Sequence, residues 1–178
     1  MSDRVAVMDH GLLEQVGRPE DVYRRPMTPF VASFVGLANQ LAGRIAGPAP
    51  GESYEVDLDH LGRRLAHGPP GLAAGAPVSV VVRPEDLRLT PAADTQAGPA
   101  AATVVDVAFL GAHRTVRLDA GALGQLVAIG QGQSAIAPDD KVVLSWADDD
   151  AWAVPAAAGE EAAEGEAAEG EAAGGEAG

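Results

Sequence analysis

The sequence predicts a mainly β protein, a small barrel or sandwich that follows a β-hairpin and two short helices. From about residue 38 to residue 154, short apolar runs are separated by Gly- and Pro-rich breaks every ten or so residues, a spacing typical of small barrels and sandwiches. Residues 1–36 have a different pattern. Two apolar runs there are followed by two segments that start at a proline and whose apolar residues have helical spacing. The last 23 residues contain only Ala, Gly and Glu.

The first two apolar runs predict a β-hairpin. Val5–Met8 and Leu12–Val16 flank Asp9-His10-Gly11. This tripeptide favours a tight turn, since Gly and Asp tolerate a positive φ.

Two short helices are predicted next. The first begins at Pro19, where a fixed φ suits the first helical position, and stops before Pro26. The second has Thr28 as its N-cap and ends at Gly36. Its apolar stripe has helical spacing and predicts ordinary core packing for Phe30, Val31, Phe34 and Val35.

Nine short strands are predicted after residue 38. Their boundaries are the Gly/Pro-rich breaks at 47–51, 68–71, 91–99 and 130–138, and the Ala-rich pieces between them are interpreted as loops. The predicted strands are Leu41–Ala46, Tyr54–Leu58, Arg64–His67, Pro77–Val82, Ala102–Phe109, Arg114–Leu118, Gln125–Ile129, Val142–Trp146 and Ala151–Val154.

The Ala/Gly/Glu block at 156–178 predicts a disordered, solvated acidic tail. It holds seven glutamates and no basic residue, and the net charge of -14 would be -7 without them. With no large apolar side chain, the block cannot offset the ordering entropy of about 1–2 kcal/mol per residue. The alternative is a segment that folds when it binds a partner.

Composition excludes several classes of function. Twelve basic residues against 26 acidic ones argue against nucleic-acid binding. The chain has no cysteine, which excludes disulfides and thiolate zinc sites. Its only lysine, Lys141, lies in Asp-Asp-Lys-Val and not in the Gly-Lys-Ser/Thr of a phosphate-binding loop. We therefore expect no ATP hydrolysis and no other enzyme activity. No stretch approaches the roughly 18–20 apolar residues of a membrane helix, and no signal peptide pattern opens the sequence, so we also expect no direct membrane insertion and a cytoplasmic location.

No catalytic or metal site is predicted. The four histidines lack metal-ligand spacing, and Asp148-Asp149-Asp150 lacks the pattern of a calcium loop, so it is interpreted as a solvated turn. No serine lies in a nucleophile elbow. Trp146 and Trp152 flank the Asp run and would lie on adjacent strands if a hairpin forms there; core or barrel-rim packing is favoured over ligand stacking.

The densest polar segment is a corner after an apolar strand. The strand runs into Arg83-Pro84-Glu85-Asp86, and the chain resumes as Leu-Arg-Leu. Pro84 holds Arg83 extended, so Arg83 and Glu85 can form a charge-assisted pair that fixes the corner. The functional alternative is an anion pocket built on Arg83. Arg83 and Glu85 are thus the candidate ligand-binding residues, although the residues themselves favour the structural corner.

Several segments resemble a known family. Met1–Tyr23, Arg25–Gly36 and Ala38-Asn39 closely resemble the end of an ABC-importer ATPase domain of the spermidine/putrescine or ferric-iron type. Val82–Arg88 resembles the Arg-Pro-Glu corner of the TOBE regulatory domain that follows in such proteins. Two later segments resemble that domain's hairpin and closing strands, Ala102–Leu118 and Val142–Val154.

The resemblance implies a fold and a division of the chain. Residues 1–36 are expected to be a remnant of the α/β ATPase domain, 37–155 a TOBE domain with an OB-like (MOP-like) barrel, and 156–178 the tail. The family's nucleotide-binding motifs would precede Met1. We therefore expect a shortened subunit or a split gene product without ATPase activity, while ATP and Mg²⁺ belong to the full-length subunit.

Two functions stay open. The first is the regulatory and dimerisation region of an importer's ATP-binding subunit, with a second copy and the permease subunits as partners, at the inner face of the cell membrane. The second is a stand-alone OB-like module that binds a small solute or oxyanion. Without the larger parent sheet, the predicted hairpin needs a cover, either from the helix at Pro29–Val35 or from a second chain.

Overall fold

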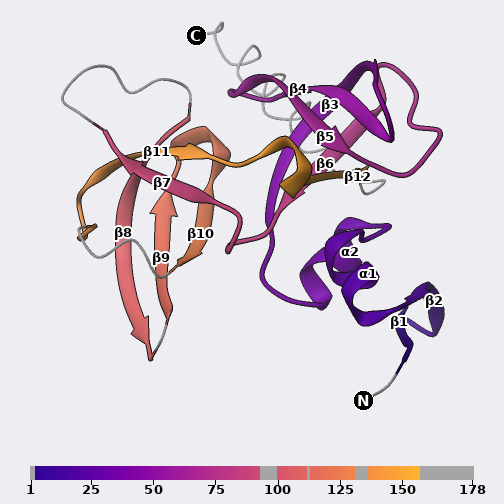
Figure 1. Cartoon of the computed structure of the whole chain (residues 1–178), viewed down its shortest axis with the longest axis horizontal. Helices are drawn as coiled ribbons and strands as arrows, with labels where there is room; N and C mark the ends of the chain where they lie inside the picture. The colour runs from indigo at the N-terminus through magenta and orange to yellow at the C-terminus, as the bar shows by residue number, and fades with distance from the viewer. Residues whose placement is uncertain (1–2, 93–99, 112, 131–135, 157–178) are drawn as a thin grey trace, which may run out of the picture.

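A hairpin with two helices, a closed barrel and a second sheet make up the chain in the computed structural model (Figure 1), which describes residues 3–92, 100–111, 113–130 and 136–156. The mainly β, OB-like prediction is confirmed. The expected acidic tail falls almost entirely outside the described residues.

The N-terminal hairpin forms as predicted. Strand β1 (Val5–Asp9) pairs antiparallel with β2 (Leu12–Gly17) across a two-residue turn. His10 and Gly11 in that turn both have positive φ, 46° and 84°. The turn twist that two such residues produce matches the twist of the flanking strands. The non-glycine residue with a positive φ in this turn is therefore His10 and not Asp9.

Both predicted helices are present. Helix α1 (Pro19–Arg24) stops before Pro26, and α2 (Pro29–Phe34) follows with Thr28 as its N-cap. The Thr28 hydroxyl accepts a hydrogen bond from the Val31 amide at 3.2 Å, which satisfies one of the free amides at the helix start.

The helices cover only one face of the hairpin. Val7 of β1, Val22 of α1 and Val31 of α2 form a small buried cluster there. The core interpretation of the α2 stripe is wrong for its two aromatic residues, which stack at 5.6 Å with Phe34 64% exposed. The helical cover expected for the hairpin is thus partial, since Met8, Leu12, Leu13 and Val16 of the hairpin remain exposed.

A five-stranded barrel follows the helices, with strand order β12-β5-β4-β3-β6. Strand β6 lies between β3 and β12 and is antiparallel to both. The barrel closes where β12 runs parallel to β5, with Trp152 opposite His67. The strands are β3 (Asn39–Ala49), β4 (Ser53–Leu58), β5 (Gly62–His67), β6 (Pro77–Val82) and β12 (Ala151–Pro155).

Strand β3 is longer than predicted. A break was expected from residue 47, but the strand continues to Ala49 across a bulge between Ile45 and Gly47. Beyond the bulge, Pro48 lies opposite Tyr54 of β4. A bulge absorbs an extra residue without ending the pairing, so Gly and Pro mark an irregularity here and not a turn.

A second sheet, with order β10-β9-β8-β11-β7, lies beside the barrel (Figure 1). The region predicted as one barrel therefore holds two β units. No hairpin joins the two tryptophans, because β11 belongs to this sheet and β12 to the barrel. Strand β7 was not among the predicted strands. The strands are β7 (Arg88–Pro91), β8 (Ala101–Leu110), β9 (His113–Asp119), β10 (Gln125–Gly130) and β11 (Lys141–Ser145).

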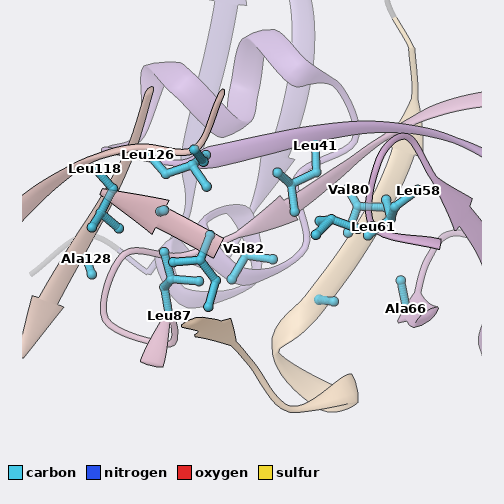
Figure 2. Close-up of a cluster of buried hydrophobic side chains, with 14 of the residues drawn as sticks. Leu41, Leu58, Leu61, Ala66, Val80, Val82, Leu87, Leu118, Leu126 and Ala128 are labelled. Carbon is cyan, nitrogen blue, oxygen red and sulfur yellow. The ribbon is translucent and has the colours of Figure 1, made fainter. Parts of the chain in front are cut away.

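The barrel and the second sheet share one hydrophobic core (Figure 2). Val82, the last residue of β6, and Leu87, just past the corner, lie between the two groups of side chains. Because each unit buries residues against the other, neither could be removed without exposing apolar surface. The labelled barrel residues are Leu41, Leu58, Leu61, Ala66 and Val80, and those of the sheet are Leu118, Leu126 and Ala128.

Among the described residues, no helix has the length and apolar character needed to cross a membrane.

Close packing of β3 on β4 predicts that a side chain at Gly43 would destabilise the fold. A Cβ at this position would lie 2.7 Å from the backbone oxygen of Asp57, which cannot rotate away. We expect Gly43→Ala to lower the free energy of unfolding by about 1–3 kcal/mol in urea denaturation. Gly47→Ala is the matched control, since a Cβ there meets nothing within 4 Å. Equal stability of the two variants would contradict this packing.

Candidate functional site

The side chain of Arg83 joins the barrel to the N-terminal helices. It directly follows β6, is only 4% exposed, and donates to three backbone carbonyls of the preceding unit. The Nε atom bonds the Tyr23 oxygen at 3.1 Å, and Nη2 bonds the same oxygen. The Nη1 atom bonds the oxygens of Ala32 at 2.9 Å and Leu37 at 3.1 Å. One cation thus holds the start, the middle and the end of the segment 23–37, which we name the helix elbow.

Tyr23 lies between the two candidate residues Arg83 and Glu85. The Arg83 guanidinium is 4.0 Å from the centroid of the Tyr23 ring, a cation–π contact. The Tyr23 hydroxyl donates to Glu85 at 2.7 Å. Burial, followed by the hydrogen bond to Glu85, raises the pKa of Tyr23 to about 12. The corner therefore positions Arg83 and Glu85 against Tyr23, in place of the direct pair that the sequence suggested.

Two more side chains of the barrel bind the elbow. The Trp152 indole N–H donates to the Pro26 carbonyl at 2.8 Å. Gln40 donates to the Pro29 carbonyl at 3.3 Å and to the Ser33 hydroxyl at 2.7 Å. We call Arg83, Trp152 and Gln40 the elbow clamp. The elbow clamp therefore contacts the backbone of the elbow more than its side chains. It binds five main-chain carbonyls, those of Tyr23, Pro26, Pro29, Ala32 and Leu37.

An apolar contact supports the clamp. Ala32 of α2 is fully buried against Val81 of β6 and Val154 of β12, and Trp152 packs at the edge of this cluster. The predicted packing role of Trp152 at the barrel rim is consistent with this position.

A cavity of about 290 Å³ lies beside the clamp, between the end of α1 and the barrel. Arg24 and Arg25 line it from the helix side, and Asp86 and Asp150 line it from the barrel side. Burial, and then repulsion from Asp150 and Glu85, raises the pKa of Asp86. The charges around this cavity are therefore mixed, and Arg24 and Asp86 lie 4.0 Å apart.

The structure separates the remaining sequence candidates. Asp148–Asp150 forms a short 3-10 turn (η2), and Asp149 contacts Nε2 of His67 at 3.0 Å. Within the described ranges, no group of three or more His, Asp or Glu residues could hold a metal ion. Sequence reasoning missed Tyr23 and Gln40 as functional residues. Tyr23 binds a residue 62 positions along the chain, and Gln40 binds residues 7 and 11 positions before it; neither arrangement has a recognisable sequence spacing.

The clamp predicts that Arg83 is essential for stability. Arg83→Met leaves three carbonyls without their donor, and we expect the free energy of unfolding to fall by at least about 2 kcal/mol. Arg83→Lys should also destabilise, because one ammonium cannot reproduce the planar fork. Arg64→Met, on the exposed side of β5, is the control and should unfold like the wild type. Wild-type stability of Arg83→Lys in urea denaturation would show that the fork is not needed.

The raised pKa of Tyr23 predicts a loss of stability in alkali. Between pH 10 and about pH 12 the unfolded chain has lost the phenol proton and the folded chain retains it, so stability falls as the pH rises through this window. We expect Tyr23→Phe to remove this part of the pH dependence in denaturation curves. An ultraviolet titration in which every tyrosine ionises near pH 10 would contradict the buried hydroxyl.

The chain is similar in sequence to a known domain family and to known transport proteins. The TOBE domain family model matches residues 80–154. The Frankia alni spermidine/putrescine import ATP-binding protein PotA is 33% identical over 170 residues, which cover 87% of this chain and 36% of that protein. PotA of Rubrobacter xylanophilus is 36% identical over 151 residues, 82% of this chain and 39% of that protein. The chain thus spans less than two fifths of the length of these relatives.

A solved structure confirms the fold. The cytoplasmic molybdate-binding protein ModG, determined with molybdate bound, superposes with a TM-score of 0.53 at 15% identity, covering 66% of this chain and 96% of that one. At this identity the likeness concerns the OB-like fold alone. The family model and the relatives confirm the resemblance seen in the sequence: the chain matches the C-terminal region of ABC-importer ATP-binding proteins and contains a match to the TOBE domain.

Proposed function

We propose that this chain is the regulatory region of the ATP-binding subunit of an importer that takes up a polyamine-type solute. The observation that carries the proposal is the elbow clamp, in which Arg83, Trp152 and Gln40 bind the backbone of residues 23–37. The clamp connects the barrel to a segment that resembles the end of an ATPase domain.

Main-chain recognition suits a regulatory contact. Each carbonyl is satisfied only while the elbow follows one path, so a shift of the helices by a few tenths of an ångström lengthens several hydrogen bonds together. The buried Arg83 charge then loses its compensation, which makes intermediate positions unfavourable. We infer that the junction transmits the position of the ATPase part to the barrel as one of a few discrete arrangements.

The proposal extends to the domains and partners. Residues 1–36 act as the end of the ATPase domain, 37–155 as the regulatory domain and 156–178 as a tail. ATP and Mg²⁺ are bound by the part of the longer subunit that relatives have outside the matched region. The partners are permease subunits and a second copy of the subunit, at the cytoplasmic face of the membrane.

The alternative, an oxyanion pocket on Arg83, has less support. Four hydrogen bonds already engage Nε, Nη1 and Nη2 of Arg83 with carbonyls of the elbow. The neighbouring cavity also carries carboxylates, which repel an anion. Arg83 and Glu85 thus act, in this proposal, on the elbow and not on a free ligand.

A chimeric transporter tests the proposal. The matching region of Rubrobacter xylanophilus PotA is replaced by this chain, and spermidine uptake and spermidine-dependent ATP hydrolysis are measured in proteoliposomes with the cognate permease. We expect the chimera to transport, and Arg83→Met to reduce uptake at least about tenfold because the junction no longer holds one arrangement.

Arg64→Met is the control and should transport like the unsubstituted chimera. Folding of each chimera is checked by its unfolding temperature, and Arg83→Lys provides a milder change where Arg83→Met folds poorly. Uptake that survives both Arg83 substitutions would overturn the proposal.

A further inference from the structure

The junction cavity is lined by basic and acidic side chains from different parts of the fold. Arg24 and Arg25, at the end of α1, supply the positive wall. Asp86 of the corner and Asp150 of η2 supply the negative wall. Arg83 also lines the cavity on this side, but its donors are bound to carbonyls of the elbow. The two walls meet where Arg24 lies 4.0 Å from Asp86, so a ligand with two unlike charges could contact both walls at once.

The negative wall is partly buried, and its ion pairs are long. The side chains of Asp86 and Asp150 are only 19% and 23% exposed. Their ion-pair contacts, with Arg24 and Arg88 respectively, both span 4.0 Å, beyond hydrogen-bond distance. Burial and mutual repulsion of the carboxylates raise the pKa of Asp86. An added ammonium group would form the short charge-assisted bonds that the arginines do not form.

The positive wall is held in place by the clamp. The Arg25 guanidinium lies 5.6 Å from the centroid of the Trp152 ring, and the Trp152 indole is itself fixed by its bond to Pro26. Val81 and Ala151 contribute apolar side chains to the lining, which also includes His67 and Asp149. At about 290 Å³, the cavity is near the lower limit of ligand pockets, roughly 300–1,000 Å³.

We propose that this cavity binds a small zwitterion, with its carboxylate on Arg24 and Arg25 and its ammonium on Asp86 and Asp150. The short aliphatic chain of such a ligand, an ω-amino acid for example, would lie along Val81 and Ala151. A ligand bound in this way links the helix elbow to the barrel, so it stabilises the junction in proportion to its occupancy. The site does not depend on the proposed role in import.

Calorimetric titration of the whole chain tests the site with γ-aminobutyrate as the probe, and with butyrate and butylammonium as analogues that carry one charge each. We expect γ-aminobutyrate to bind at least about tenfold more tightly than either analogue, since each analogue leaves one wall without a partner. It should also raise the unfolding temperature.

Matched substitutions separate the cavity from general charge effects. Asp86→Asn and Arg25→Gln should each weaken binding at least about tenfold. Asp106→Asn and Arg117→Gln remove the same groups from an ion pair on β8 and β9 and should bind like the wild type. Asp150→Asn, in the surface turn η2, tests the negative wall again in case Asp86→Asn does not fold.

Several results would contradict the proposal of a zwitterion site. Binding of butyrate or molybdate as tight as that of γ-aminobutyrate would indicate an anion site, and equal binding of butylammonium a cation site. No saturable binding of γ-aminobutyrate, or unchanged binding by the cavity variants, would equally rule it out. Because uptake by the chimera is measured separately, failure here leaves the proposed regulatory function standing.

Discussion

The buried guanidinium of Arg83 is the constraint on which the arrangement of this chain depends. A cation removed from water is strongly destabilising unless nearly all its donors are satisfied. Here the compensation comes from carbonyls at three points of the helix elbow and from the Tyr23 ring. The helices must therefore stay where they are for Arg83 to be buried at all, and the burial of one side chain fixes the position of a whole unit.

A second constraint joins the barrel to the sheet beside it. The chain leaves the barrel after β6, forms the sheet and returns as β12 to close the barrel between β5 and β6. The buried side chain of Asn39 reinforces this link, because it both donates to and accepts from the backbone of Val127 in β10, at 2.9 and 2.8 Å. The barrel and the sheet thus form one interlocked body, onto which the elbow is clamped.

Local chemistry was sufficient to predict most elements but not their assembly. The turn at His10-Gly11, the start of α2 at Thr28 and most strands follow from residue preferences that act within a few positions. The end of β3 was missed because a bulge and a turn use the same residues, Gly and Pro. The exposed stacking of Phe30 and Phe34 was missed because an apolar stripe does not specify what it packs against.

The sequence by itself determined the mainly β class, the hairpin, the two helices and the importance of the Arg-Pro-Glu corner, since each depends on backbone preferences or on one fixed proline. Only the tertiary structure decided that β11 and β12 belong to different units and that Arg83 acts on the elbow backbone. It also decided that charges of opposite sign meet around one cavity. Those outcomes depend on contacts between residues far apart in the chain, and such contacts are set by how the whole core packs.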